Sequence, residues 1–194
     1  MKTFSRRCDP GGQGGRVLVA LAVFLAVLGA AADGFPEEKA AAARKMLEPG
    51  ASAPGFAARD AEGESFDFGA ENGRSPSVVV FFSVFCEPCR RALAVAQKLQ
   101  DRHRDAGWRV VGVSLDGPPL AGAVAGFARQ EGYTFRVLMD EPDARDLFRA
   151  ADLFGVSEIP TTFVIEKGGR IAFARRGPVM EEEIEKLMRP ARKP

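Results

Sequence analysis

The chain has 194 residues, of which 46% are hydrophobic, and its 27 Lys and Arg residues nearly balance its 26 Asp and Glu residues. The formal net charge of +1 provides no broad electrostatic field for nucleic acid or acidic ligands, so we expect no nucleic-acid partner. This length suits one well-buried domain with additional segments at its ends.

The N-terminal segment predicts export across a membrane. Basic residues precede an uninterrupted apolar run at positions 17–32; they are Lys2, Arg6, Arg7 and Arg16. This is the layout of a secretory signal, and the small residues at 30–32 offer a cleavage site before Asp33. Residues 1–32 are therefore either a signal peptide, which releases a soluble protein, or a retained anchor formed by 17–32. Both outcomes place the remainder outside the cytoplasm, and we expect the bacterial periplasm.

Residues 33–48 are rich in Ala, Lys and Glu, which predicts a linker. We expect the folded domain at 49–190 and a short tail at 191–194. The domain begins with two short strands around a turn at 61–64, the second strand at about 65–68. The continuous apolar run at 78–82 is typical of a buried central strand.

Strands and helices alternate after this run. The apolar spacing predicts helices at about 91–105, 120–131, 144–154 and 180–188, and strands at 109–115, 135–139, 161–165 and 171–174. Glycines at 168 and 169 indicate a hairpin between the last two strands. This order predicts an α/β fold in which a central mixed β-sheet carries helices on both faces and an N-terminal β-hairpin extension.

The motif Cys86-Glu87-Pro88-Cys89 lies between the strand at 78–82 and the helix that follows it. Two intervening residues at the first turn of a helix let the sulfur atoms bond, and unpaired N–H groups there favour a thiolate. We therefore expect Cys86 to be the exposed attacking residue and Cys89 its recessed partner. Pro88 suits the start of a helix, and the negative charge of Glu87 opposes thiolate formation, which tunes the couple toward a reductant.

Other chemistries of this cysteine pair stay open. A zinc site would need Cys86, Cys89, His103 and a carboxylate, because the only further cysteine is Cys8 in the N-terminal segment. A structural disulfide here would constrain very little chain. A Cu(I) metallochaperone would use both thiolates, although no Met or His flanks the motif. We favour a redox couple, with no metal and no cofactor beyond the disulfide itself.

Ile159 and Pro160 stand directly before a predicted strand, and the bond between them is a candidate for cis geometry. With the C-x-x-C motif and the order of elements, this proline makes the chain resemble the thioredoxin superfamily. The resemblance implies that Ile159 and Pro160 form a substrate-docking edge opposite Cys86, and that Phe85 adds an aromatic surface for substrate.

The chain is similar to the TlpA/ResA/DsbE group of extracytoplasmic proteins. The similarity lies in the export signal, in Pro49-Gly50, in the run Ala53-Pro54-Gly55-Phe56 and in the dipeptide Glu87-Pro88. The resemblance covers roughly residues 48–188. It implies a thiol–disulfide oxidoreductase that reduces protein partners, notably apocytochrome c during cytochrome maturation, and that receives electrons from a membrane thiol reductase. The membrane itself would be contacted only through a retained 17–32 segment.

The chain departs from these relatives at three positions. Phe85 replaces a common Trp, Val80 occupies the place of a buried acid in thioredoxins, and Ala92 stands where ResA-like proteins often carry Glu. Glu158 is interpreted as a solvated loop acid. A redoxin-type peroxidase remains an alternative, but its usual Pro-x-x-x-Thr-x-x-Cys pattern is absent before Cys86.

Two aspartates, Asp116 and Asp140, follow predicted strands. Such residues either cap the next helix or line the rim of a site. We expect both to cap helices, because an aspartate side chain readily accepts hydrogen bonds from the free N–H groups of a helix start.

Overall fold

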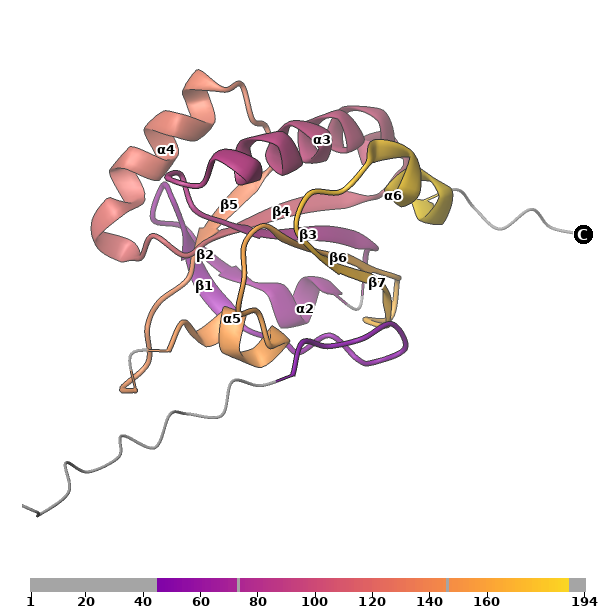
Figure 1. Cartoon of the computed structure of the whole chain (residues 1–194), viewed down its shortest axis with the longest axis horizontal. Helices are drawn as coiled ribbons and strands as arrows, with labels where there is room; N and C mark the ends of the chain where they lie inside the picture. The colour runs from indigo at the N-terminus through magenta and orange to yellow at the C-terminus, as the bar shows by residue number, and fades with distance from the viewer. Residues whose placement is uncertain (1–44, 73, 146, 189–194) are drawn as a thin grey trace, which may run out of the picture. The chain divides into compact units, whose positions relative to one another are not determined.

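A computed structural model describes residues 45–72, 74–145 and 147–188 (Figure 1). Within these residues, seven strands form one mixed sheet in the order β2-β1-β5-β4-β3-β6-β7. The strands are β1 (Ala57–Asp60), β2 (Ser65–Asp67), β3 (Ser77–Phe82), β4 (Arg109–Ser114), β5 (Arg136–Met139), β6 (Thr161–Ile165) and β7 (Ile171–Arg176). Neighbours β3, β4 and β5 run parallel, and the other neighbouring pairs run antiparallel.

Helices cover both faces of this sheet. They are α2 (Phe68–Asn72), α3 (Glu87–His103), α4 (Ala121–Gln130), α5 (Arg149–Phe154) and α6 (Glu181–Met188), with short 3₁₀ turns η1 (Arg104–Ala106) and η2 (Pro118–Leu120). In Figure 1, α3, α4 and α6 lie on one side of the sheet and α2 and α5 on the other. Buried side chains of the first three helices belong to one apolar cluster, and those of α2 and α5 belong to a second. The predicted fold class, a mixed sheet with helices on both faces and an N-terminal hairpin β1–β2, is confirmed.

The interior strand β3 lies between β4 and β6, and its six residues are all buried. Alternate side chains of a strand point to opposite faces, so Val78, Val80 and Phe82 join the cluster beneath α3. Val79 and Phe81 join the cluster on the opposite face. A strand covered on both sides must be apolar throughout, which explains why a continuous apolar run identified β3 in the sequence.

The structure differs from the sequence-based prediction around α5, which begins at Arg149 although a helix was predicted from 144. Asp143 is the cause, because its carboxylate accepts the N–H of Arg145 at 2.7 Å and its N–H donates to Leu147 O at 2.8 Å. These bonds close a turn in the place of a helical one. Helix α2 was not predicted either, and it begins at Phe68, where a strand was expected.

The start of α5 is fixed by Asp140, which is fully buried at the end of β5. Its two carboxylate oxygens accept the N–H groups of Ala150 at 2.9 Å and Ala151 at 2.8 Å. Burial is the main cause of a raised Asp140 pKa, and these two N–H groups partly oppose it. The predicted helix-capping role of Asp140 is confirmed.

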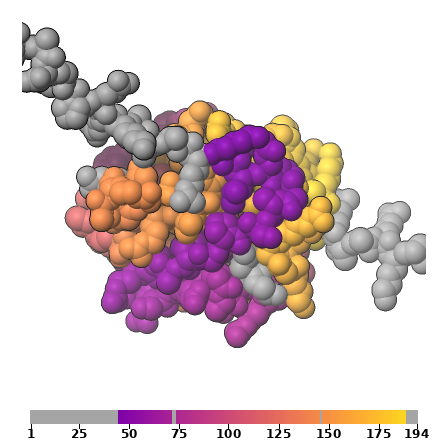
Figure 2. All heavy atoms as spheres, turned by 90° about the horizontal axis from the view of Figure 1, so that it is seen from below, coloured from indigo at the N-terminus to yellow at the C-terminus, as the bar shows by residue number. Residues whose placement is uncertain are grey.

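The first described residues lie against α5. The N–H of Leu47 donates to Phe154 O at 3.1 Å, and Met46 and Leu47 pack against the second apolar cluster. Figure 2 looks onto this face, with the 45–60 region in indigo and the α5 region in orange. The predicted signal or anchor at 1–32, most of the linker at 33–48 and the tail at 191–194 lie outside the described residues. In the part that is described, no helix combines the length and apolarity needed to cross a membrane.

An aromatic cluster centred on Phe154 holds α5 to the sheet. The Phe154 ring lies 5.0 Å from that of Phe163 in β6 and 5.3 Å from that of Phe81 in β3, measured between ring centroids. Two further rings, Phe56 and Phe68, lie 6.2 and 6.3 Å away. Aromatic side chains packed in this way contribute much of the stability of a core.

We expect the substitution Phe154→Ala to lower the free energy of unfolding by about 3–5 kcal/mol, because it opens a cavity among four rings. Urea unfolding followed by circular dichroism measures this difference. Leu187→Ala is the control, since Leu187 is 40% exposed on α6 and should cost far less. Equal losses of unfolding free energy in the two variants would contradict the conclusion that the aromatic cluster is centred on Phe154.

Candidate active site

Cys86 lies just beyond β3, as the residue that caps the N-terminus of α3. Its backbone is extended, with φ −98° and ψ 105°, and its Sγ accepts a hydrogen bond from the N–H of Cys89 at 3.2 Å. Cys86 and Cys89 form a disulfide, with their Cα atoms 5.2 Å apart. Pro88 occupies the first turn of α3, where its missing N–H costs no hydrogen bond.

The two sulfur-bearing residues differ in exposure. Cys86 is partly exposed, whereas Cys89 is 0% exposed and belongs to the apolar cluster beneath α3. Ala92, Leu93 and Ala96 of the same helix are buried in that cluster. A thiolate or disulfide of an outside molecule can therefore approach the site through Cys86, while Cys89 stays behind it.

The proline loop lies against this disulfide. The Ile159–Pro160 bond is cis, as expected from the sequence, and Cys86 Sγ lies 4.0 Å from Ile159 O. Pro160 is buried and Ile159 is partly exposed. Gly177 directly follows β7, and its N–H donates a hydrogen bond to Pro160 O at 2.7 Å. This bond joins the proline loop to the segment after β7. The structure thus brings together two motifs that are 73 residues apart in the sequence.

Three segments that follow strands of the sheet each carry an exposed apolar side chain. Phe85 directly precedes Cys86 and is 78% exposed, and Met180 lies three residues after Gly177 and is 64% exposed. Leu120, 36% exposed, belongs to η2 in the segment that follows β4. Since β3 and β4 are parallel, their carboxyl ends meet at one edge of the sheet. The sequence analysis named Phe85 but missed Leu120 and Met180, because nothing local distinguishes them from core residues.

Glu87 and Arg90 form the charged side of the first turn of α3. The Glu87 side chain is 81% exposed and lies 3.8 Å from the Arg90 guanidinium. Arg90 also lies 3.3 Å from a carboxylate oxygen of Glu131 and 5.1 Å from the centre of the Phe127 ring. Solvent screens the charge of a side chain as exposed as Glu87, so its influence on Cys86 is small.

Asp116 is the site neighbour whose role the sequence analysis misassigned. It does not cap a helix, and its carboxylate instead accepts hydrogen bonds from Ser83 and Val84 in the loop that leads to Cys86. The expectation of helix capping is wrong for Asp116 because its donors are Ser83 and Val84 of the segment after β3 and Ser114 of its own strand, β4. Its place two residues after β4, a strand parallel to β3, is the signal that could have indicated this contact.

The positions at which related proteins carry acids are apolar here. Val80 and Ala92 are buried in the cluster that contains Cys89, and Glu158 is exposed. The carboxylates buried in the described part of the chain are Asp60 and Asp140. Asp60 pairs with Arg136 at 3.1 Å and Asp140 caps α5, so both have structural partners of their own.

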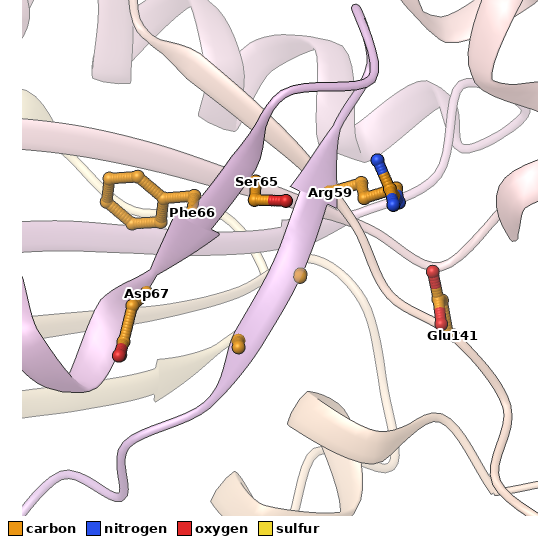
Figure 3. Close-up of a pocket in the computed structure, with 7 residues that line it drawn as sticks. Arg59, Ser65, Phe66, Asp67 and Glu141 are labelled. Carbon is orange, nitrogen blue, oxygen red and sulfur yellow. The ribbon is translucent and has the colours of Figure 1, made fainter.

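An open hollow of about 370 Å³ lies elsewhere, over β1 and β2. The labelled side chains of Figure 3 line it and come from these two strands and from the segment after β5; they are Arg59, Ser65, Phe66, Asp67 and Glu141. None of the residues singled out in the sequence lines this hollow. Among the described residues, no group of three or more His, Cys, Asp or Glu side chains is placed to hold a metal ion.

The mixed sheet, the half-exposed disulfide at a helix start and the facing cis-proline define a thioredoxin-like thiol–disulfide oxidoreductase. The AhpC/TSA family model matches residues 49–174, and the chain belongs to this family.

Individual relatives agree with this class. The chain is 29% identical over 168 residues to "Thiol-disulfide oxidoreductase ResA" of Geobacillus thermodenitrificans, covering 86% of this chain and 88% of the relative. It is 26% identical over 145 residues to the ResA of Halalkalibacterium halodurans, covering 75% and 78%. The solved structure of a thiol:disulfide interchange protein DsbE from Chlorobium tepidum matches with a TM-score of 0.62 and 26% identity, covering 74% of this chain and 96% of that one.

The difference in exposure predicts the reactivity of the two thiols. In the reduced protein, we expect iodoacetamide to modify Cys86 roughly tenfold or more faster than Cys89, since the reagent must reach the sulfur and the thiolate must attack it, displacing iodide. Mass spectrometry of quenched time points measures both rates. Comparable rates in the folded protein would contradict the assignment of Cys86 as the outer residue, and unfolding in urea should equalise them.

Proposed function

We propose that this protein reduces disulfides of partner proteins through the Cys86–Cys89 pair. One observation carries the proposal: the partly exposed Cys86 sulfur lies beside Ile159 O, with the fully buried Cys89 behind it. A Cu(I) carrier would need both sulfur atoms open to the same ion, and the burial of Cys89 disfavours that use of the pair.

The reaction proceeds in two exchange steps. The Cys86 thiolate attacks one sulfur of a substrate disulfide, which forms a mixed disulfide and releases the other substrate sulfur as a thiolate. Cys89 then loses its proton and attacks Cys86 Sγ, which releases the second substrate thiolate. The protein is left with its own disulfide, and two electrons have passed to the substrate. N–H groups at the start of α3, among them that of Cys89 at 3.2 Å from Cys86 Sγ, favour the Cys86 thiolate that begins the sequence.

The proposed substrate-binding residues are Phe85, Ile159 and Pro160. Backbone groups of the proline loop would bind an extended substrate segment, and the exposed ring of Phe85 would cover apolar residues beside the substrate cysteine. The exposed side chains of Met180 and Leu120 would extend this apolar surface. A surface of this kind suits a flexible protein segment better than a small disulfide, because only the segment is large enough to cover it.

The proposal also names the protein's location and its partners. The N-terminal layout supports export to the periplasm, with the domain either released or anchored by 17–32. The names of the ResA and DsbE relatives support thiol–disulfide exchange. The resemblance to the TlpA/ResA/DsbE group implies apocytochrome c as the substrate and a membrane thiol reductase as the electron donor. The dithiol needs no metal or other cofactor for this chemistry.

Trapping tests the proposed function directly. In Cys89→Ser the second step is blocked, so we expect mixed disulfides between Cys86 and partner proteins to accumulate in cells. Non-reducing gels followed by mass spectrometry of the excised bands identify the partners. Reducing agent should release the partner from each complex.

Cys86→Ser is the matched control for this experiment and should trap no partner, since the attacking sulfur is lost. The proposal fails if Cys89→Ser yields no linked protein, or if Cys86→Ser yields the same set. Apocytochrome c among the trapped proteins would support its assignment as a substrate. If other thiol proteins are trapped but apocytochrome c is not, that substrate is rejected and the reductase function is retained.

The apolar surface predicts a selective effect of Phe85→Ala. We expect KM for insulin, used as a protein disulfide substrate, to rise about fivefold, which corresponds to roughly 1 kcal/mol of lost apolar contact. Turnover of the small substrate 5,5′-dithiobis(2-nitrobenzoate) should change less than about twofold. Leu187→Ala, which removes an exposed apolar side chain of α6, should leave both values unchanged. Equal effects on the two substrates would contradict a docking role for Phe85.

A further inference from the structure

Asp116 joins the segments that follow β3 and β4. Its Oδ1 accepts a hydrogen bond from Ser83 Oγ at 2.6 Å, and its Oδ2 accepts from Ser114 Oγ at 2.7 Å and from the N–H of Val84 at 3.0 Å. Ser114 is fully buried and Asp116 is partly buried. A charged acceptor with three donors makes strong, well-directed hydrogen bonds. The carboxylate therefore ties the ends of two parallel strands together.

The same contacts fix the turn that carries the redox site. The N–H of Phe85 donates to Ser83 Oγ at 3.2 Å, and the N–H of Cys86 donates to Ser83 O at 3.2 Å. The N–H of Val84 donates to the Asp116 carboxylate. Every backbone N–H from Val84 to Cys86 therefore donates to either Asp116 or Ser83. The positions of the Phe85 ring and the Cys86 sulfur thus depend on this carboxylate.

We infer that Asp116 is a positioning residue of the redox site: it holds the 83–86 turn in place, and its negative charge favours the disulfide over the reduced Cys86 thiolate. The inference rests on the proposed dithiol chemistry. A nearby like charge opposes formation of a thiolate, and a partly buried carboxylate is screened less than the exposed Glu87. Disfavouring the reduced form makes the couple a stronger reductant.

Asp116→Asn tests this role by equilibration in buffers of reduced and oxidised dithiothreitol. We expect the equilibrium constant for forming the Cys86–Cys89 disulfide to fall by about three- to tenfold, where tenfold equals about 30 mV for a two-electron couple. Asp67→Asn is the matched control, because the Asp67 carboxylate accepts the N–H of Ala70 at 3.0 Å in the β2–α2 region. Its equilibrium constant should equal that of the wild type.

Ser83→Ala provides a second test that keeps the charge of Asp116. It removes the acceptor for the N–H of Phe85, so we expect kcat/KM for insulin to fall about threefold while that for 5,5′-dithiobis(2-nitrobenzoate) stays within about twofold. A selective loss on insulin supports the fixed turn.

Two results would overturn the inference. The first is an Asp116→Asn equilibrium constant equal to that of Asp67→Asn, even if thermal stability falls, because Asp116 would then be only structural. The second is a Ser83→Ala variant with unchanged activity on both substrates. The dithiothreitol equilibrium requires no protein substrate, so it distinguishes a failure of this inference from a failure of the proposed reductase function.

Discussion

The packing of α3 against the sheet determines where both sulfur atoms lie. Apolar side chains on one side of the helix are fully buried in the cluster that contains Cys89; they are Ala92, Leu93, Ala96 and Leu99. This contact holds the first turn of α3 at the end of β3, so Cys86 remains at the surface as the helix cap and Cys89 enters the core. The unequal roles of two neighbouring cysteines follow from the burial of one helix face.

Sheet topology supplies the rest of the site. Antiparallel pairing of β6 with β3 places the start of β6, and with it Pro160, at the edge where Cys86 lies. Parallel pairing of β4 with β3 brings Asp116 to the same edge, 33 residues from Ser83 in the sequence. The disulfide, the cis-proline loop and the Asp116 carboxylate, which come from distant parts of the chain, are thereby brought to one edge of the sheet.

Features that depend on local pattern could be predicted from the sequence. A continuous apolar run identified β3, the C-x-x-C spacing identified the redox pair, and the proline before a strand indicated the cis bond. Features that depend on tertiary hydrogen bonds could not. The late start of α5 follows from the turn that Asp143 closes, and the contact of Asp116 with Ser83 requires knowledge of strand order. Asp140 and Asp116 have the same sequence context but different partners, which only the fold distinguishes.

The reduction potential of the Cys86–Cys89 couple tests the central claim most directly. The N–H groups at the start of α3 favour a Cys86 thiolate, whereas the Asp116 carboxylate opposes it and the apolar surroundings of Cys89 oppose ionisation of Cys89. The balance predicts a reductant, with a potential more negative than about −180 mV, the value typical of protein disulfide isomerase. A potential near about −120 mV, that of the strong oxidant DsbA, would contradict the proposed direction of electron flow.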